Sequence, residues 1–246
     1  MSEKTYFDFA CEVLNMAPEE LKKRIEISHI ESDTMIRDEW NAINPQTEQE
    51  IIDVYTKYPG YTLFYIRLYG NFSQYREYQD AGSLQMLEKY VPDVKNKKIL
   101  EYGAGVCLRP LGLYNLGCKH VTMADIPTPM FEIARRAFGS YIGEDKFLKI
   151  TKKYPLKENY DVIFCTDVLE HVRDPDKVLR HLTEHTKYLY MKTFFGGSDY
   201  APPHLQENSK YAADFETWIE VIKSCGLKPI YLENAINGLY EKNTVQ

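Results

Sequence analysis

Two glycines and two carboxylates in the middle of the chain have the residue types and spacing of a ligand-binding turn. Glu101 is followed by Gly103 and Gly105 directly after the apolar run KKILEY, and Asp125 ends the next apolar run, HVTMAD. Glycine lets a ligand approach the backbone closely because it has no side chain, and a carboxylate accepts hydrogen bonds from both hydroxyls of a ribose. The pattern therefore indicates a nucleoside site. The alternative is that the glycines form only a tight strand-to-helix turn.

The same turn departs from G-x-G-x-x-G, the fingerprint of dinucleotide-binding proteins. Leu108 stands where the third glycine would pack the helix closely against the strand. This mismatch disfavours the binding of NAD and FAD, so an NAD-dependent oxidoreductase remains only as a less favoured interpretation of the turn.

Two histidines are candidates for a general base, a group that removes a proton from a bound substrate. His171 lies in LEHV, just after the apolar run YDVIFCTD, and His204 lies in the long connection GGSDYAPPHLQENSKYAAD. Connections of that length often cover active sites. The alternatives are a structural role for His171 and a solvated loop position for His204.

The segment HLTEH formally matches the H-x-x-E-H pattern of one class of zinc proteases. On the predicted helix, however, His181, Glu184 and His185 lie opposite the apolar stripe and face solvent. Neither a third ligand nor a cleft is indicated, so we predict no metal site.

The elements that position these residues are predicted from a change of periodicity at about Lys97. Helical segments then alternate with short apolar runs, which occupy residues 97–103, 120–126, 146–150, 160–167, 187–195 and 228–234. This alternation is typical of a parallel sheet covered by helices on both faces. We therefore predict an α/β fold with a Rossmann-like, doubly wound, mostly parallel sheet over residues 96–246.

The first 95 residues are predicted to be helical. Pro18 suits the first turn of one helix, Asp33 suits the N-cap of a second, and Thr47 with Glu50 forms a capping box for a third. Tyrosine is abundant, with 20 residues in the chain, many of them between positions 55 and 90. We predict a helical N-terminal lid region, residues 1–95, that precedes the sheet.

Three features together resemble the class I S-adenosylmethionine-dependent methyltransferases. They are the E-x-G-x-G turn, the acidic end of the second strand and the segment YDVIFCTDVLEHVRDPDKVL. LEHV followed by a D-P helix start resembles the branch that includes the ubiquinone-type and many small-molecule methyltransferases. The resemblance runs from about Lys97 to Leu232. It implies that the cofactor is bound by Glu101, Tyr102, Gly103, Ala104 and Gly105 at its methionine part, by Asp125 at the ribose, by Ile126 at the adenine, and by Thr166, Asp167 and Val168 on the sulfonium side.

The chain departs from this family in two places. Cys107 stands where the family often has a further glycine, and Thr151, Lys152 and Lys153 follow the third strand, where the family has an acidic residue for the adenine amino group. Thr151 or a backbone group is the expected replacement.

The resemblance implies an enzyme that needs few catalytic side chains. The sulfonium already carries a good leaving group, so orientation of the acceptor supplies much of the acceleration. We predict a methyltransferase that acts on a small molecule, with His171 and His204 as catalytic candidates. The alternative is a catalytically silent cofactor-binding partner or regulatory protein, which turnover would distinguish.

The N-terminal helices of related methyltransferases fold over the cofactor cleft, and aromatic faces there can contact a sulfonium or an apolar acceptor. On this basis Tyr65, Tyr75, Arg76 and Tyr78 are predicted to belong to the cover. The alternative is that the tyrosine-rich segment only packs the helical region.

Composition excludes several other classes of protein. The net charge is −6 and no run of Lys and Arg exceeds a pair, which disfavours nucleic acid as a partner. The five cysteines contain no C-x-x-C pair and indicate reduced thiols rather than a disulfide framework. No signal peptide or membrane span is predicted. We expect a soluble, cytoplasmic protein that does not bind membranes; the sequence does not indicate an oligomeric state.

Overall fold

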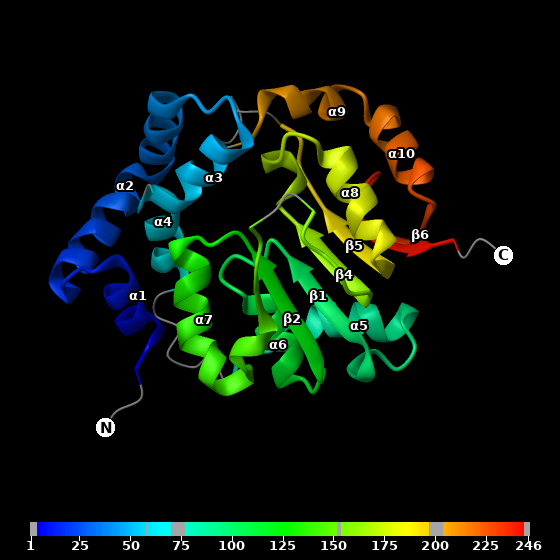
Figure 1. Cartoon of the computed structure of the whole chain (residues 1–246), viewed down its shortest axis with the longest axis horizontal. Helices are drawn as coiled ribbons and strands as arrows, with labels where there is room; N and C mark the ends of the chain where they lie inside the picture. Colours follow the sequence, from blue (N-terminus) through cyan, green and yellow to red (C-terminus); the bar gives the residue numbers. More distant parts are fainter. Residues whose placement is uncertain (1–3, 58, 70–76, 152–153, 197–203, 244–246) are drawn as a thin grey trace.

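The computed structural model describes residues 4–57, 59–69, 77–151, 154–196 and 204–243. Within these residues the strands form one seven-stranded sheet in the order β3-β2-β1-β4-β5-β7-β6 (Figure 1). Neighbouring strands from β3 to β5 pair in parallel, and β7 is antiparallel to both of its neighbours. The predicted doubly wound, mostly parallel sheet is confirmed. The strands are β1 (Lys98–Tyr102), β2 (His120–Asp125), β3 (Phe147–Lys149), β4 (Tyr160–Thr166), β5 (Thr186–Lys192), β6 (Leu227–Leu232) and β7 (Gly238–Lys242).

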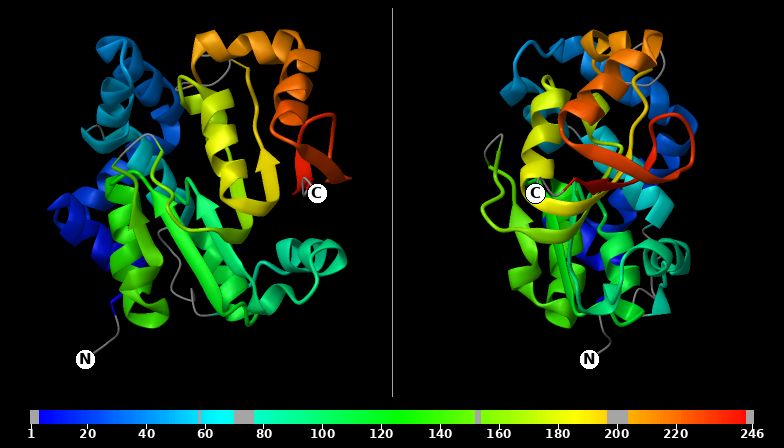
Figure 2. Two further views of the ribbon diagram at one scale, coloured as in Figure 1. Left: turned by 45° about the vertical axis from the view of Figure 1, so that its right-hand side comes forward. Right: turned by 90° about the vertical axis from the view of Figure 1, so that its right-hand side faces the viewer.

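Helices cover both faces of the sheet, as Figure 2 shows. The side chains of β4 alternate between the two faces: Val162 and Phe164 pack towards α5 and α6, whereas Ile163 and Cys165 pack towards α8 and α10. All four are buried, so the strand is apolar throughout, as is typical of a parallel strand covered on both sides. The helices that follow the N-terminal region are α5 (Ala81–Tyr90), α6 (Leu108–Asn115), α7 (Pro129–Ile142), α8 (Pro175–Glu184), α9 (Lys210–Ala213) and α10 (Phe215–Ser224).

Four further helices precede α5: α1 (Tyr6–Leu14), α2 (Pro18–Ile43), α3 (Glu48–Lys57) and α4 (Pro59–Tyr69). The capping box of α3 is present, because the backbone N–H of Thr47 donates to Glu50 Oε2 at 2.8 Å and that of Glu50 donates to Thr47 Oγ1 at 3.2 Å. The predicted helix start at Asp33 is wrong. The backbone of α2 continues through this residue, since no proline or glycine interrupts residues 19–43.

Strand β7 was not expected from the sequence. It follows a turn in which Asn234 Oδ1 accepts hydrogen bonds from the backbone N–H groups of Ile236 (3.0 Å) and Asn237 (2.8 Å). Asn237-Gly238 then leads into β7, which inserts between β5 and β6. The sheet therefore ends in an antiparallel pair at the edge far from β1 and β2.

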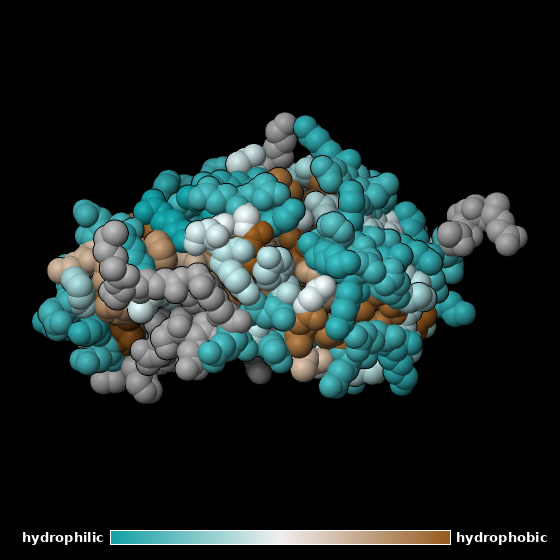
Figure 3. Space-filling model, turned by 90° about the horizontal axis from the view of Figure 1, so that it is seen from below, coloured by the Kyte–Doolittle hydropathy of each residue, from teal (hydrophilic) through white to brown (hydrophobic). Residues whose placement is uncertain are grey.

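The described residues contain no helix that is both long enough and apolar enough to cross a membrane. The face of the molecule drawn in Figure 3 is mainly hydrophilic, and its apolar residues form separate small groups.

Candidate active site

The turn after β1 has the backbone geometry that its glycines predict. Gly103 and Gly105 adopt φ angles of 77° and 52°. The N–H groups of Gly103 and Ala104 both donate to the carbonyl of Ala124 in β2, at 2.8 and 3.1 Å. A Cβ atom on Gly103 would lie 2.1 Å from Val168 Cγ2. The turn is therefore closely packed at the carboxyl end of β1, beside the place where the strand order reverses, which is where open α/β sheets bind their ligands.

Asp125 ends β2 with its carboxylate directed at this turn. Its Oδ2 accepts the N–H of Gly105 at 2.6 Å and its Oδ1 accepts the N–H of Ile126 at 2.7 Å. Burial raises the pKa of Asp125 to about 6, although both backbone hydrogen bonds oppose the rise. Each carboxylate oxygen has a further lone pair, so the two oxygens fit the paired hydroxyls of a ribose.

Glu101, the acidic residue of the predicted turn, is buried and paired with Arg109 of α6. Arg109 also donates to Thr166 Oγ1 at 3.0 Å, lies 3.6 Å from Asp80 Oδ2 and stacks 5.0 Å above the centre of the Phe164 ring. Burial raises the pKa of Glu101 to about 7, and the guanidinium of Arg109 opposes that rise. This network joins the ends of β1 and β4 beneath the turn.

The segment that follows β4 meets the turn through some of its predicted residues. Thr166 joins the Arg109 network, and Val168 packs against Gly103. Asp167 has a φ angle of 54° and an exposed side chain, so it contributes little to the packed part of the site.

Three of the predicted cofactor-binding residues have side chains that pack partly or wholly in the protein core. The side chain of Tyr102 is buried in the cluster on the α8 side, and that of Ala104 is buried on the α7 side. Ile126 is half-buried at the edge of the first of these clusters. Tyr102 and Ala104 therefore offer a ligand mainly their backbone, whereas Ile126 retains an accessible side chain.

The structure brings the two predicted catalytic histidines together. His171 ends the short 3-10 helix Leu169–His171, and its ring centre lies 4.8 Å from that of His204, in an edge-on arrangement. The ring centre of Phe194, two residues after β5, lies 6.2 Å from that of His204. Burial, followed by the nearby His171, lowers the pKa of His204 to about 4. His204 is therefore neutral at neutral pH.

Glu170, His171 and His204 offer ligand atoms that all lie within 4.8 Å of one another, so this group could hold a metal ion. Both oxygens of Glu170 already have protein partners, because Thr193 Oγ1 donates to Oε2 at 2.8 Å and the Phe194 N–H donates to Oε1 at 3.2 Å. The carboxylate thereby fixes the start of the connection after β5.

The second such group is the HLTEH segment at the end of α8, formed by His181, Glu184 and the C-cap residue His185. The N–H of Leu156 donates to His181 Nε2 at 3.1 Å, and His185 Nδ1 lies 3.1 Å from the carbonyl oxygen of Glu158. These contacts tie α8 to the segment before β4.

Helix α3 lies on the side to which the arrowheads of the central strands point in Figure 1, and α4 packs beside α7. Tyr55 of α3 packs edge-on to His171 with 6.1 Å between ring centres, and Tyr61 of α4 packs edge-on to Tyr55 at 4.9 Å. Arg173 donates to the carbonyl of Pro45, between α2 and α3, at 3.0 Å. The N-terminal helices are thus attached directly to the segment that carries His171.

The residues predicted to belong to the cover lie in different parts of the molecule. Tyr65 belongs to this aromatic group, since its hydroxyl lies 3.3 Å from that of Tyr61. Tyr78 lies elsewhere, beside α6, where its carbonyl accepts a hydrogen bond from Asn115 at 2.8 Å. Tyr75 and Arg76 lie outside the described residues.

Sequence reasoning missed two residues of this site, Arg109 and Tyr55. Arg109 lies eight positions after Glu101, in the first turn of α6, and a buried carboxylate needs a cation nearby. That requirement was the available signal. Tyr55 had no comparable signal, because only the packing of α3 against the segment after β4 brings it to His171.

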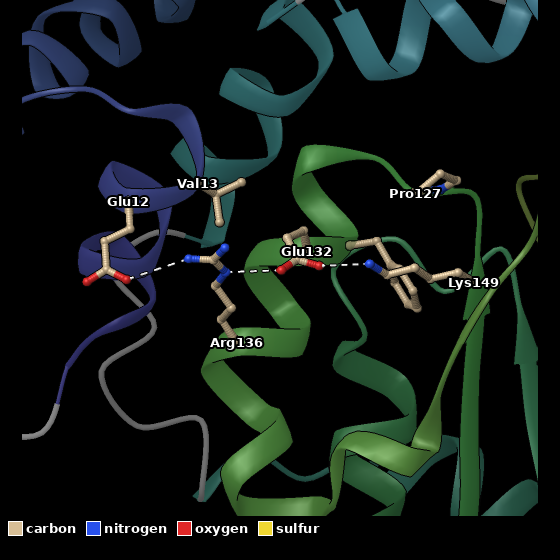
Figure 4. Close-up of a pocket in the computed structure, with 7 residues that line it drawn as sticks. Glu12, Val13, Pro127, Glu132, Arg136 and Lys149 are labelled. Carbon is tan, nitrogen blue, oxygen red and sulfur yellow. Dashed lines mark hydrogen bonds and ion pairs between the residues drawn. The ribbon is translucent and has the colours of Figure 1, made fainter.

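A separate pocket of about 320 Å³ lies between α1 and α7. Figure 4 shows a chain of ion pairs along it: Arg136 lies between Glu12 (3.8 Å) and Glu132 (3.0 Å), and Lys149 lies 3.4 Å from Glu132. Pro127 and Lys149 place the pocket beside the ends of β2 and β3, but none of the predicted site residues lines it. Its charges pair with one another and attach α1 to α7.

Comparison with models of protein families identifies the family to which the chain belongs. A family model described as a methyltransferase domain matches residues 73–230, which is more than half of the sequence. The chain therefore belongs to this methyltransferase family, and its resemblance to the class I S-adenosylmethionine-dependent methyltransferases is confirmed. No curated protein shows significant similarity to the chain.

Solved structures with a similar fold include several methyltransferases. Magnesium protoporphyrin IX methyltransferase from Synechocystis, with S-adenosylmethionine bound, is 14% identical, with 89% of this chain and 97% of that chain covered and a TM-score of 0.48. A putative S-adenosylmethionine-dependent methyltransferase from Methanococcus maripaludis is 14% identical, with coverage of 67% and 84% and a TM-score of 0.47. A putative RNA methyltransferase from Pyrococcus horikoshii is 16% identical, with coverage of 65% and 81% and a TM-score of 0.44. At these identities the likeness concerns the fold and not the substrate.

Proposed function

We propose that this protein transfers a methyl group from S-adenosylmethionine to a small-molecule acceptor. The observation that carries the proposal is the Asp125 carboxylate, held by the N–H groups of Gly105 and Ile126 at the reversal of strand order. When bound, S-adenosylmethionine supplies a methyl group attached to a positively charged sulfur. The sulfur becomes part of a neutral thioether once the methyl group has been transferred.

The residues of the chain would bind and orient the methyl donor. Asp125 would accept the ribose hydroxyls, Ile126 would face the adenine, and the backbone from Gly103 to Gly105 would pass the methionine part. The faces of Tyr55 and Tyr61 are partly negative and suit a nearby sulfonium. Because orientation alone supplies much of the acceleration in such a site, few further groups are needed.

Two features support a small acceptor over a nucleic acid. Helices α2 and α3 pack onto the connection after β5, where Trp40, Ile51 and Val54 bury Leu205. A long polymer would have to displace this cover. The net charge of −6 also repels phosphates. We infer that residues 1–95 act as a lid on a core formed by residues 96–246, and that the protein works in the cytoplasm.

His171 and His204 are the proposed catalytic residues. Their rings are adjacent, and His204 is neutral at neutral pH, so it has a free nitrogen lone pair to accept a proton from an acceptor. Glu170 holds the neighbouring segment in place through Thr193 and Phe194.

Turnover tests this proposal. The protein is incubated with S-adenosylmethionine and, in separate reactions, with a metabolite extract, total RNA and denatured cell protein, and release of S-adenosylhomocysteine is measured. We expect release with the metabolite extract, its loss in Asp125→Asn, and no release with RNA or protein. Release that depends on RNA would contradict the small-molecule assignment. Binding of the cofactor without release under any condition would favour a catalytically silent partner or regulatory protein.

A further inference from the structure

Two buried polar atoms at this site have no hydrogen-bond partner among the residues described: Tyr55 Oη and His204 Nδ1. Buried polar atoms are nearly always paired, so an unpaired one in a native protein requires an explanation. One explanation is that a ligand supplies the missing partner.

The two atoms belong to rings that both pack edge-on against His171. The Tyr55 ring lies 6.1 Å from His171 and the His204 ring lies 4.8 Å from it. Tyr55 comes from the N-terminal helices, whereas His204 comes from the connection after β5. His171 directly follows Glu170 and the segment whose Val168 contacts the glycine turn. The two unpaired atoms therefore belong to two separate parts of the chain that pack against the same residue, His171.

The charges around Tyr55 indicate which ligand atoms suit this position. After burial and the neighbouring Tyr65, the carboxylates of Glu170 and Asp125 raise the pKa of Tyr55 further. Tyr55 is therefore a neutral phenol in a negative environment. An anionic group would be repelled here, whereas an oxygen or nitrogen that donates hydrogen is favoured.

We propose that Tyr55 Oη and His204 Nδ1 accept hydrogen bonds from the two hydrogens of the reacting atom of the acceptor, which is then an amine nitrogen and not a hydroxyl oxygen or a carbon. This inference rests on the proposed methyl transfer. Holding the two hydrogens of the amine on Tyr55 and His204 turns its lone pair towards the methyl group.

The step balances without a further reactant. The lone pair of the acceptor forms the bond to the methyl carbon while the carbon–sulfur bond breaks, and the electrons of that bond remain on sulfur. The proton of the acceptor passes to His204 Nδ1 when the resting proton of the ring is on Nε2. The positive charge thus moves from the sulfonium to the histidine.

The test uses sinefungin, an analogue of S-adenosylmethionine in which a carbon bearing an amino group replaces the sulfur and its methyl. The amino group therefore reports on the place where acceptor and methyl meet. Affinities for sinefungin and for S-adenosylhomocysteine are measured calorimetrically for the wild type, Tyr55→Phe and Tyr6→Phe. Tyr6 is a matched control, because its buried hydroxyl also has no partner but lies in α1 against Phe138.

We expect Tyr55→Phe to weaken sinefungin binding by about tenfold, the effect of one hydrogen bond to a charged group, and to leave S-adenosylhomocysteine binding unchanged. Tyr6→Phe should change neither affinity. Both variants should melt at or above the wild-type temperature, since each loses an unpaired buried hydroxyl, and this excludes misfolding as the cause.

Equal weakening of both ligands would overturn the inference, because the hydroxyl would then serve the body of the cofactor. Unchanged binding of both ligands to Tyr55→Phe would overturn it too. If the wild type binds neither ligand, the proposed function itself fails and the inference fails with it. The two failures are distinguished by the wild-type titration alone.

Discussion

Replacing Arg109 by methionine should destabilise the protein in a strongly pH-dependent way. Arg109 is the cation paired with the buried Glu101, whose side chain is 7% exposed. Removing one partner of a buried ion pair leaves the other charge uncompensated, which typically costs about 3–5 kcal/mol. Methionine keeps an apolar side chain of similar length over Phe164, so the loss of packing is small.

The pH dependence follows from the pKa of Glu101. Burial raises this pKa to about 7, against an ordinary value of 4.5, even with Arg109 in place. The folded protein therefore retains a proton that the unfolded chain releases as the pH rises from about 5 to 7. Wild-type stability falls across that window by up to about 3 kcal/mol. Without Arg109 the folded pKa rises further, so the variant continues to lose stability above pH 7.

Urea unfolding at about pH 5 and pH 8.5 measures the effect. Near pH 5 Glu101 is protonated in the folded state, so the cost of Arg109→Met should be about 1 kcal/mol, the value of a lost hydrogen bond. At pH 8.5 it should approach the 3–5 kcal/mol of an unpaired buried charge. Adding Glu101→Gln should restore most of the stability lost at pH 8.5. Equal costs at the two pH values, or no recovery in the double variant, would show that Arg109 does not stabilise the protein by compensating the charge of Glu101.

Three further predictions concern the turn and the end of β5. Gly103→Ala should lower the free energy of unfolding by more than 2 kcal/mol. Gly226 has a similar φ of 73° but open space around it, so Gly226→Ala should lower the free energy of unfolding by only about 1 kcal/mol, and thermal unfolding measures both changes. S-adenosylhomocysteine affinity should fall about tenfold per pH unit below pH 6, where Asp125 becomes protonated, and calorimetry of Asp125→Asn should show no such slope. Asn237→Ala removes the 2.9 Å hydrogen bond to the buried Thr193 N–H and should lower the free energy of unfolding by about 1–3 kcal/mol.

Much of the fold could be predicted because its determinants are local. The apolar runs of β1, β2 and β4, the capping box of Thr47 and Glu50, and the proline that opens α8 are all visible in short windows of sequence. Strand β7 was missed because its pairing with β5 and β6 is set by contacts distant in sequence, and only Asn237-Gly238 marks its start. The false helix start at Asp33 shows that a capping residue inside a long helical stretch does not by itself end a helix.

The site could be predicted where the chemistry requires a particular residue type at a fixed place on a strand. Gly103, Gly105 and Asp125 meet this condition, and the structure brings them together at the ends of β1 and β2. Arg109 and Tyr55 do not, because any helix position can place a long or aromatic side chain near a site once the helix has packed. Their roles depend on tertiary contacts that no periodicity encodes.

Whether the turn after β1 binds S-adenosylmethionine is tested most directly by a calorimetric titration of the protein with S-adenosylhomocysteine, with NAD as the control ligand and Asp125→Ala as the control protein. We expect saturable binding of one equivalent by the wild type, strong weakening in the variant and no binding of NAD. Absence of binding by the wild type would mean that the glycines at 103 and 105 form only a tight turn between β1 and α6.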